Sequence, residues 1–480
     1  MTRRRKIVGV VAAGVLIAPV PAGIAGADES CEFRAAAGDP AAVVDGRTRA
    51  GAVQVRCGDR WLTLRQGTAG VADEPEAGDL FGASVAVADV DRNGAADLVI
   101  GAPGEDEGAG AVHVVFGPGN DGQPAPIVLR QGAGGVPDRS EAGDGYGSAV
   151  AAMRGTVLVG APGEDLGDGE AKVDAGAVHV VSISGGQVGG VTELNQDKQD
   201  FDGTVESGDR FGASLAAGDF DKPTAVIGAP GEDVADKKDA GMVHIVEDPV
   251  VAIEETGLGQ DSAGVSGASE PGDRFGASVA AAWVPALPVR VAAGAPGEDL
   301  GDAADAGMVT VLGYDGRQAT EVLAVHQGTA GVPGASEDGD GFGTSVAAGV
   351  IESASAPGPE VSVAIGSPGE DLGDLADSGR VHGVQVGSDP RVDGVVSQQT
   401  DGFGDVPRAK ARFGAALAFG PGAASIVAGA PGHEGKGAAH ATPWRALFGT
   451  AVVADNWFAG DGGVPAGSAF GSSVAADPAG

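Results

Sequence analysis

The sequence is poor in basic residues, in aromatic residues and in long apolar runs. Its 480 residues include 30 Lys and Arg against 67 Asp and Glu, a formal net charge of -37, and only 4% of them are aromatic. Such an acidic surface repels a phosphate backbone, so the composition excludes a nucleic-acid-binding protein. Beyond residue 20 no stretch approaches the roughly 20 apolar residues of a transmembrane helix. Runs with helical periodicity are also missing.

The first 27 residues have the features of a signal peptide. Four basic residues at 3–6 precede an apolar run over 7–20, and a small-x-small cleavage site follows at 25–27. We therefore expect a secreted protein, exported by the Sec route or by the twin-arginine (Tat) route that Thr2-Arg3-Arg4 indicates.

Glycine is abundant, with 86 residues, and much of it recurs in phase. An aromatic residue followed by Gly opens seven copies of one pattern, about 65 residues apart. The seven aromatic residues are Phe81, Tyr146, Phe211, Phe275, Phe342, Phe413 and Phe470. Six copies continue with Gly-Ala-Pro or Gly-Ser-Pro, an acidic loop and a stretch like Ala-Gly-Ala-Val-His-Val.

Each copy reads as four short strands separated by Gly, Pro and Asp. In the first copy we expect strands at 84–87, 98–101, 111–116 and 127–130. Four-stranded units repeated seven times form either a closed propeller or an open array with special caps.

The chain ends favour the propeller. The last copy stops soon after its first strand, and three matching strands occur near the amino terminus, at 41–44, 50–55 and 61–66. The sequence therefore predicts an all-β, seven-bladed β-propeller over residues 28–480. Residues 28–66 supply three strands of the last blade and residues 467–480 supply the fourth.

The order of these motifs resembles the FG-GAP repeat of integrin alpha amino-terminal propellers and of many secreted bacterial proteins. The resemblance covers nearly the whole mature chain. It departs in the seventh copy, where Val44-Asp45-Gly46 stands in place of the tripeptide, and in copies six and seven, which lack the Asp two residues before the aromatic. The resemblance implies calcium loops and ligands that approach the face carrying the acidic loops.

The two cysteines fit this topology. Cys31 precedes the second strand of the shared blade and Cys57 ends the third, so both lie at the same face of an up-and-down blade. An exported protein permits the bond, and we expect a Cys31–Cys57 disulfide.

A calcium loop is predicted between the first two strands of the first blade. Alternating Asp and Asn followed by Gly lets a tight loop aim oxygens at a hard cation. The predicted ligands are the side chains of Asp89, Asp91, Asn93 and Asp97 and the carbonyl of Ala95. The alternative is a metal-free turn, because the same residues are common in turns.

Acidic loops follow the tripeptides and form a second candidate site. By strand parity all six lie on the face opposite the calcium loop. The candidate binding residues are Glu164, Asp165, Asp168, Glu232, Asp233, Asp236, Glu298, Asp299, Asp302, Glu370, Asp371 and Asp374. Three interpretations remain open: a solvated surface, a cation-binding rim, or a docking face for a basic partner.

Catalytic patterns are harder to find. His113, His179, His244, His382 and His440 share one third-strand position, which indicates a structural role. There is no Gly-x-Ser-x-Gly turn and no phosphate-binding loop. We therefore expect a monomeric, non-catalytic, calcium-binding module for binding or adhesion to a protein or glycan ligand. The alternative is an extracellular hydrolase of phospholipid or glycan on the same propeller.

Overall fold

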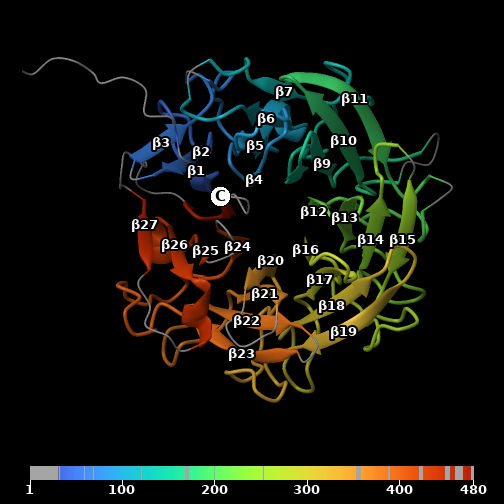
Figure 1. Cartoon of the computed structure of the whole chain (residues 1–480), viewed down its shortest axis with the longest axis vertical. Coiled ribbons are helices and arrows are strands. Elements are labelled where there is room, and N and C mark those ends of the chain that lie inside the picture. Colours follow the sequence, from blue (N-terminus) through green and yellow to red (C-terminus); the bar gives the residue numbers. More distant parts are fainter. Residues whose placement is uncertain are drawn as a thin grey trace, which may run out of the picture.

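Seven four-stranded antiparallel sheets form a ring in the computed structural model (Figure 1). The structure describes residues 31–476 except 32, 59, 69, 121, 168–171, 199–200, 252, 353–357, 388–389, 421–424, 449–453 and 460–468. The predicted signal peptide lies outside these residues. The seven-bladed β-propeller is confirmed.

Blades 1 to 6 each run from an inner strand to an outer strand in chain order. Blade 1 consists of β4 (Ser84–Ala88), β5 (Asp97–Ala102), β6 (Ala111–Val115) and β7 (Ile127–Leu129). These bounds agree with the predicted ranges to within a few residues. In the described part of the chain, helical turns occur only in loops: α1 (Glu105–Gly108), η2 (His433–Gly435) and η3 (Trp444–Phe448).

Blades 2 to 6 repeat this order. Blade 2 has β8 (Ala149–Met153), β9 (Thr156–Ala161), β10 (Ala177–Ser184) and β11 (Gln187–Leu194); blade 3 has β12 (Ser214–Asp219), β13 (Pro223–Ala229), β14 (Met242–Glu247) and β15 (Glu254–Leu258). Blade 4 has β16 (Ser278–Ala282), β17 (Val289–Ala295), β18 (Met308–Tyr314) and β19 (Ala319–Val325). Blade 5 has β20 (Ser345–Glu352), β21 (Pro359–Ser367), β22 (Arg380–Val386) and β23 (Arg391–Val396); blade 6 has β24 (Ala416–Phe419), β25 (Ser425–Ala430), β26 (Ala438–Pro443) and β27 (Asp455–Phe458).

The two chain ends complete blade 7 together. Its order is β28 (Ser473–Ala476), β1 (Phe33–Asp39), β2 (Ala52–Cys57) and β3 (Arg60–Leu64). β28 pairs with β1 in the register Ala35↔Ala476 to Gly38↔Ser473. The first and last described segments therefore lie side by side.

The predicted position of the second strand in this blade was wrong. The strand is β1, not 41–44; Val44 lies in the following loop, where it bridges Arg47. Gly38-Asp39-Pro40 consequently takes the place of the tripeptide, which the sequence interpretation had placed at 44–46. Asp replaces the usual Ala or Ser, and this change concealed the seventh copy.

The aromatic-Gly dipeptides join adjacent blades. All seven aromatic side chains are fully buried. The Phe81 N–H donates to the Ala50 carbonyl of blade 7 (3.1 Å), and the Gly82 N–H donates to Gly101 of its own blade (2.9 Å). The Ser84 hydroxyl donates to the Gly147 carbonyl of blade 2 (2.7 Å). The hydroxyl of Ser84, two residues after Gly82, therefore links two neighbouring blades. This agrees with the structural role that its repeated position in the sequence indicates.

The core lies between blades. Val53 and Val55 of β2 pack in one cluster with Leu98 and Ile100 of β5, and Phe81 completes that cluster. Because each aromatic fills the space between two blades, a small number of large side chains suffices for the whole ring. The Cys31–Cys57 disulfide is present beside the same cluster.

Candidate functional site

The predicted calcium loop joins β4 to β5 at one face of the ring. Carboxylate oxygens of Asp89, Asp91 and Asp97 lie within 4.8 Å of one another. Asp97 is fully buried and Asp91 is nearly so. Three of the five predicted ligands are therefore gathered at one point.

Hydrogen bonds within the loop explain this geometry. Asp97 Oδ2 accepts from the backbone N–H groups of Val90 (2.9 Å) and Asp91 (3.2 Å). Asp91 Oδ1 accepts from the Asn93 N–H (3.0 Å), and Asn93 Oδ1 accepts from the Ala95 N–H (2.7 Å). The remaining two predicted ligands, Asn93 and Ala95, thus belong to the same compact turn.

The loop carries more negative charge than its own contacts neutralise. Burial raises the pKa of Asp97 to about 6, and the charge of Asp91 acts in the same direction against the backbone donors. Asp89 Oδ1 is buried without a hydrogen-bond partner, while Asp89 Oδ2 lies 3.3 Å from Arg154 Nε. Three close carboxylates with an unused buried oxygen are donors of the kind that calcium prefers.

The corresponding corner of blade 3 is neutralised by protein groups. Asp219 Oδ2 accepts from the Arg154 backbone N–H (3.0 Å). Lys222 Nζ contacts Glu247 (2.7 Å) and Glu254 (3.3 Å). The sequence at this corner keeps Asp219 and Asp221 but continues with Lys222-Pro223, so it lacks the Gly and the final Asp of the predicted calcium loop.

The acidic loops lie on the opposite face, because they join second strands to third strands. In five of the six loops the first Glu accepts a hydrogen bond from a glutamine, whereas the sixth loop has His433 at this position, 3.2 Å from Gln398 Nε2. The pairs are Gln131–Glu164, Gln196–Glu232, Gln260–Glu298 and Gln327–Glu370. Gln66 pairs with Glu105 in the same way.

The first Asp of each loop stabilises the loop itself. Asp165, Asp233, Asp299 and Asp371 each accept, through Oδ1, a backbone N–H further along their own loop. The third acid of each loop is exposed at Asp236, Asp302 and Asp374, whereas Asp168 lies outside the described residues. Asp165, Asp299 and Asp371 are exposed as well, so the described solvent-facing members of the candidate set include both first and third acids of these loops.

Arginines on this face were missed by the sequence interpretation. Arg210 and Arg274 precede Phe211 and Phe275 with φ of 55° and 56°. Together with Lys238, Asp239 and Asp305 they line a depression of about 580 Å³. An arginine directly before the aromatic in copies three, four and six was the available signal.

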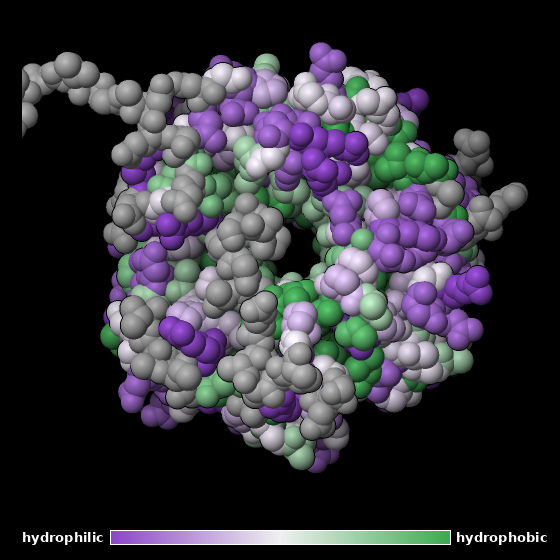
Figure 2. All heavy atoms as spheres, in the orientation of Figure 1, coloured by the Kyte–Doolittle hydropathy of each residue, from purple (hydrophilic) through white to green (hydrophobic). Residues whose placement is uncertain are grey.

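The central region of the molecule is open on the viewed face. Figure 2 shows an opening near the middle of the ring, with hydrophobic residues along its lower edge and paler to hydrophilic residues on its right. No helix among the described residues is long and apolar enough to cross a membrane.

Comparison with known proteins agrees with this fold. The FG-GAP repeat model matches residues 81–115. The chain is thus a seven-bladed β-propeller with an FG-GAP repeat at residues 81–115, and the integrin-alpha-like resemblance is consistent with this. No curated protein matches it.

Several solved structures share the overall arrangement at low sequence identity. A periplasmic gluconolactonase of Pseudomonas aeruginosa has 11% identity and a TM-score of 0.44, over 92% of this chain and 99% of that one. A putative 6-phosphogluconolactonase of Bacteroides uniformis has 8% identity and a TM-score of 0.43, over 86% and 92%. A fucose-specific lectin of Aleuria aurantia has 11% identity and a TM-score of 0.37, over 80% and 96%.

Proposed function

We propose that the protein is a secreted, calcium-binding, integrin-alpha-like propeller that acts as a non-catalytic binding or adhesion module. The observation that carries the calcium assignment is the convergence of Asp89, Asp91 and Asp97 around an unpartnered buried oxygen. The Cys31–Cys57 disulfide and the FG-GAP repeat both suggest an extracellular protein.

Calcium is expected to stabilise the folded protein. If the affinity has the extracellular range of about 0.1 to 1 mM, 10 mM calcium adds about 1.4 to 2.7 kcal/mol. Thermal unfolding of the chelator-treated mature protein, with and without calcium, measures this gain. Asp89→Ala should abolish the calcium-dependent rise in midpoint, because it removes one of the three carboxylates.

Asp219→Ala is the matched control, since Asp219 occupies the same corner of blade 3 and also contacts Arg154. Its calcium response should equal that of the wild type. Equal calcium responses of Asp89→Ala and Asp219→Ala would contradict the site.

Ligand binding is proposed on the face of the acidic loops. The depression beside Arg210 and Arg274 offers guanidinium groups next to Asp239 and Asp305, so it suits a polar protein or glycan ligand with both hydrogen-bond donors and acceptors. The double variant Arg210→Asn, Arg274→Asn keeps residues that tolerate a positive φ. It should capture less material from cell-envelope and extracellular extracts than the wild type.

Arg317→Asn, in the β18–β19 turn on the opposite face, is the control and should capture normally. Equal capture by the double variant would contradict this binding face. Turnover of a phospholipid or glycan panel by the pure protein would instead favour the hydrolase alternative.

A further inference from the structure

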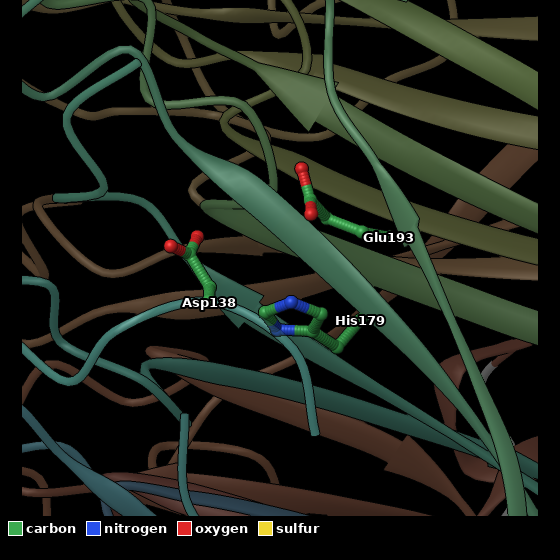
Figure 3. Close-up of side chains that lie close together, drawn as sticks. All are labelled: Asp138, His179 and Glu193. Carbon is green, nitrogen blue, oxygen red and sulfur yellow. The ribbon is translucent and has the colours of Figure 1, made fainter. Parts of the chain in front are cut away.

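Blade 2 brings a histidine and two carboxylates together away from the calcium loop. Asp138 lies in the loop that leads into the blade, His179 lies on β10, and Glu193 lies directly across from His179 on β11. Figure 3 shows that the three side chains, from this loop and these two strands, lie close together. One ligand atom from each lies within 4.8 Å of the others.

Within this cluster, the imidazole of His179 makes no hydrogen bond. The side chain is fully buried, and neither ring nitrogen has a hydrogen-bond partner. The ring packs against Tyr146, whose buried hydroxyl is also without a partner. A buried imidazole with no partner costs free energy unless something binds it.

The other blades provide a comparison within one molecule. Asp73 and Asp405 occupy the positions of Asp138 in the loops that lead into blades 1 and 6. Asp73 forms an ion pair with Arg130, and Asp405 lies 3.6 Å from His433 Nε2. In those two blades a basic side chain therefore accompanies the aspartate.

In blade 2, Asp138 lies near other carboxyl groups instead. Asp138 interacts with the buried carboxyl of Glu164. Glu193 accepts from Asn195 Nδ2 (2.5 Å) and lies 3.5 Å from Lys198 Nζ, a side chain that is about half exposed. Asn195 stands where blade 1 has Arg130, so the described residues of this blade lack the guanidinium that balances the charge in blade 1.

We propose that Asp138, His179 and Glu193 form a zinc-binding site in blade 2, with water completing the coordination. One imidazole and two carboxylates are ordinary zinc ligands, whereas calcium prefers oxygens alone. Ligand atoms around a tetrahedral zinc lie about 3.3 Å apart, so side-chain shifts of roughly 1 Å assemble the site. Asp138 is exposed, which gives the ion access from solvent.

The test is zinc titration of the chelator-treated mature protein, by calorimetry and in excess calcium, with cobalt absorption as a second readout. Wild-type protein should bind one zinc ion in this blade, and cobalt should give visible d–d bands. His179→Gln should weaken binding by about 100-fold or more, since losing even an outer-shell partner costs about 10- to 100-fold. Gln is the natural residue at this strand position in blade 7, as Gln54, so the fold should tolerate it.

His382→Gln in blade 5 is the matched control. His382 occupies the same strand position and is also buried without partners, but it is not part of a carboxylate cluster of this kind in the described structure. It should bind zinc like the wild type. Absence of saturable zinc binding by the wild type, or equal binding by the two histidine variants, would overturn the proposal.

Asp138→Asn provides a second test on an exposed position, should His179→Gln fail to fold. It is expected to reduce zinc affinity by about 10-fold or more. Wild-type affinity in this variant would likewise overturn the proposal.

Discussion

At the residue scale, a buried aspartate stands two residues before five of the seven aromatics. Its Oδ2 accepts the backbone N–H of the residue three positions earlier, at 2.5 to 2.8 Å. The five are Asp79, Asp144, Asp209, Asp273 and Asp340. Burial raises the pKa of each above its ordinary value.

The pKa shifts give the folded state a defined pH dependence. The pKa of Asp273 rises from 3.8 to about 7, so the folded protein binds more protons than the unfolded chain between these values. Stability contributed by the protonated carboxyl is therefore lost as the pH rises from about 4 to 7. Buried histidines act oppositely: burial lowers the pKa of His113 to about 4, so its contribution grows as the pH rises from about 4 to 6.5.

Asp273→Asn should reduce the loss of stability between about pH 4 and 7, because the Asn side chain can still accept the hydrogen bond from the Glu270 N–H without ionising. Relative to the wild type, the variant should gain on the order of a few kcal/mol between pH 5 and pH 8. Thermal midpoints at the two pH values measure this. Asp302→Asn, which replaces an exposed carboxyl on the same face, should show little change; an equal response of both variants would contradict the assignment.

At the scale of the element, the glycine one residue before the end of each second strand sets the distance between neighbouring blades. A Cβ built on Gly101 of β5 would lie 2.0 Å from the Gly147 carbonyl oxygen of blade 2. Gly38 stands in the same relation to Gly82, also at 2.0 Å. Close backbone packing between neighbouring blades thus requires the glycine of the tripeptide.

Gly101→Ala should destabilise the protein by about 1 to 3 kcal/mol or more, since the blades must separate to admit the methyl group. Gly190→Ala in β11 is the control, because its Cβ would meet nothing within 4 Å. That change should be neutral or slightly stabilising. Denaturant unfolding compares the two variants, and a Gly101→Ala protein as stable as Gly190→Ala would refute this packing role.

At the scale of the whole molecule, the ring is closed by noncovalent and covalent contacts at one blade. β28 pairs with β1, and the Ser473 hydroxyl donates to the Gly82 carbonyl of blade 1 (2.7 Å). The disulfide joins the segment before β1 to the end of β2. Closure leaves β1 with a partner on both sides, so its edge is not exposed to other chains.

Removal of residues 469–480 should therefore greatly lower the thermal midpoint and favour aggregation. Moving the same residues ahead of Cys31 through a short linker should restore a midpoint close to that of the wild type, because β28 and β1 are already neighbours. Calorimetry and light scattering follow both changes. A truncated chain that unfolds like the wild type would show that β28 is dispensable for closure.

Much of the fold was predictable because its signals are local and repeated. Seven copies of Phe-Gly or Tyr-Gly revealed the blade number, and the incomplete last copy revealed the shared blade. The position of β1 was not predictable in the same way, because Gly38-Asp39-Pro40 differs from the other tripeptides. The position of Gly38 in β1 is defined by its close backbone contact with Gly82 of the neighbouring blade, and not by the identity of the residues that follow it.

The candidate sites also differ in how far local sequence predicts them. Asp89, Asp91 and Asp97 are close in sequence, so a turn motif alone brought them together. Glu164 and its equivalents are oriented by hydrogen bonds from glutamines 33 to 43 residues away. The number of acidic residues in the loops, taken from the sequence, could not distinguish these glutamates from surface charges.

The sequence by itself determined the seven-fold repeat, the pairing of the chain ends, the cysteine pair and the acidic turn between β4 and β5. Only the tertiary structure decided which acids are buried and which are exposed. It alone placed Asp138 and Glu193 beside His179, because cross-strand register and the loop between blades, neither of which is written in local spacing, set those distances.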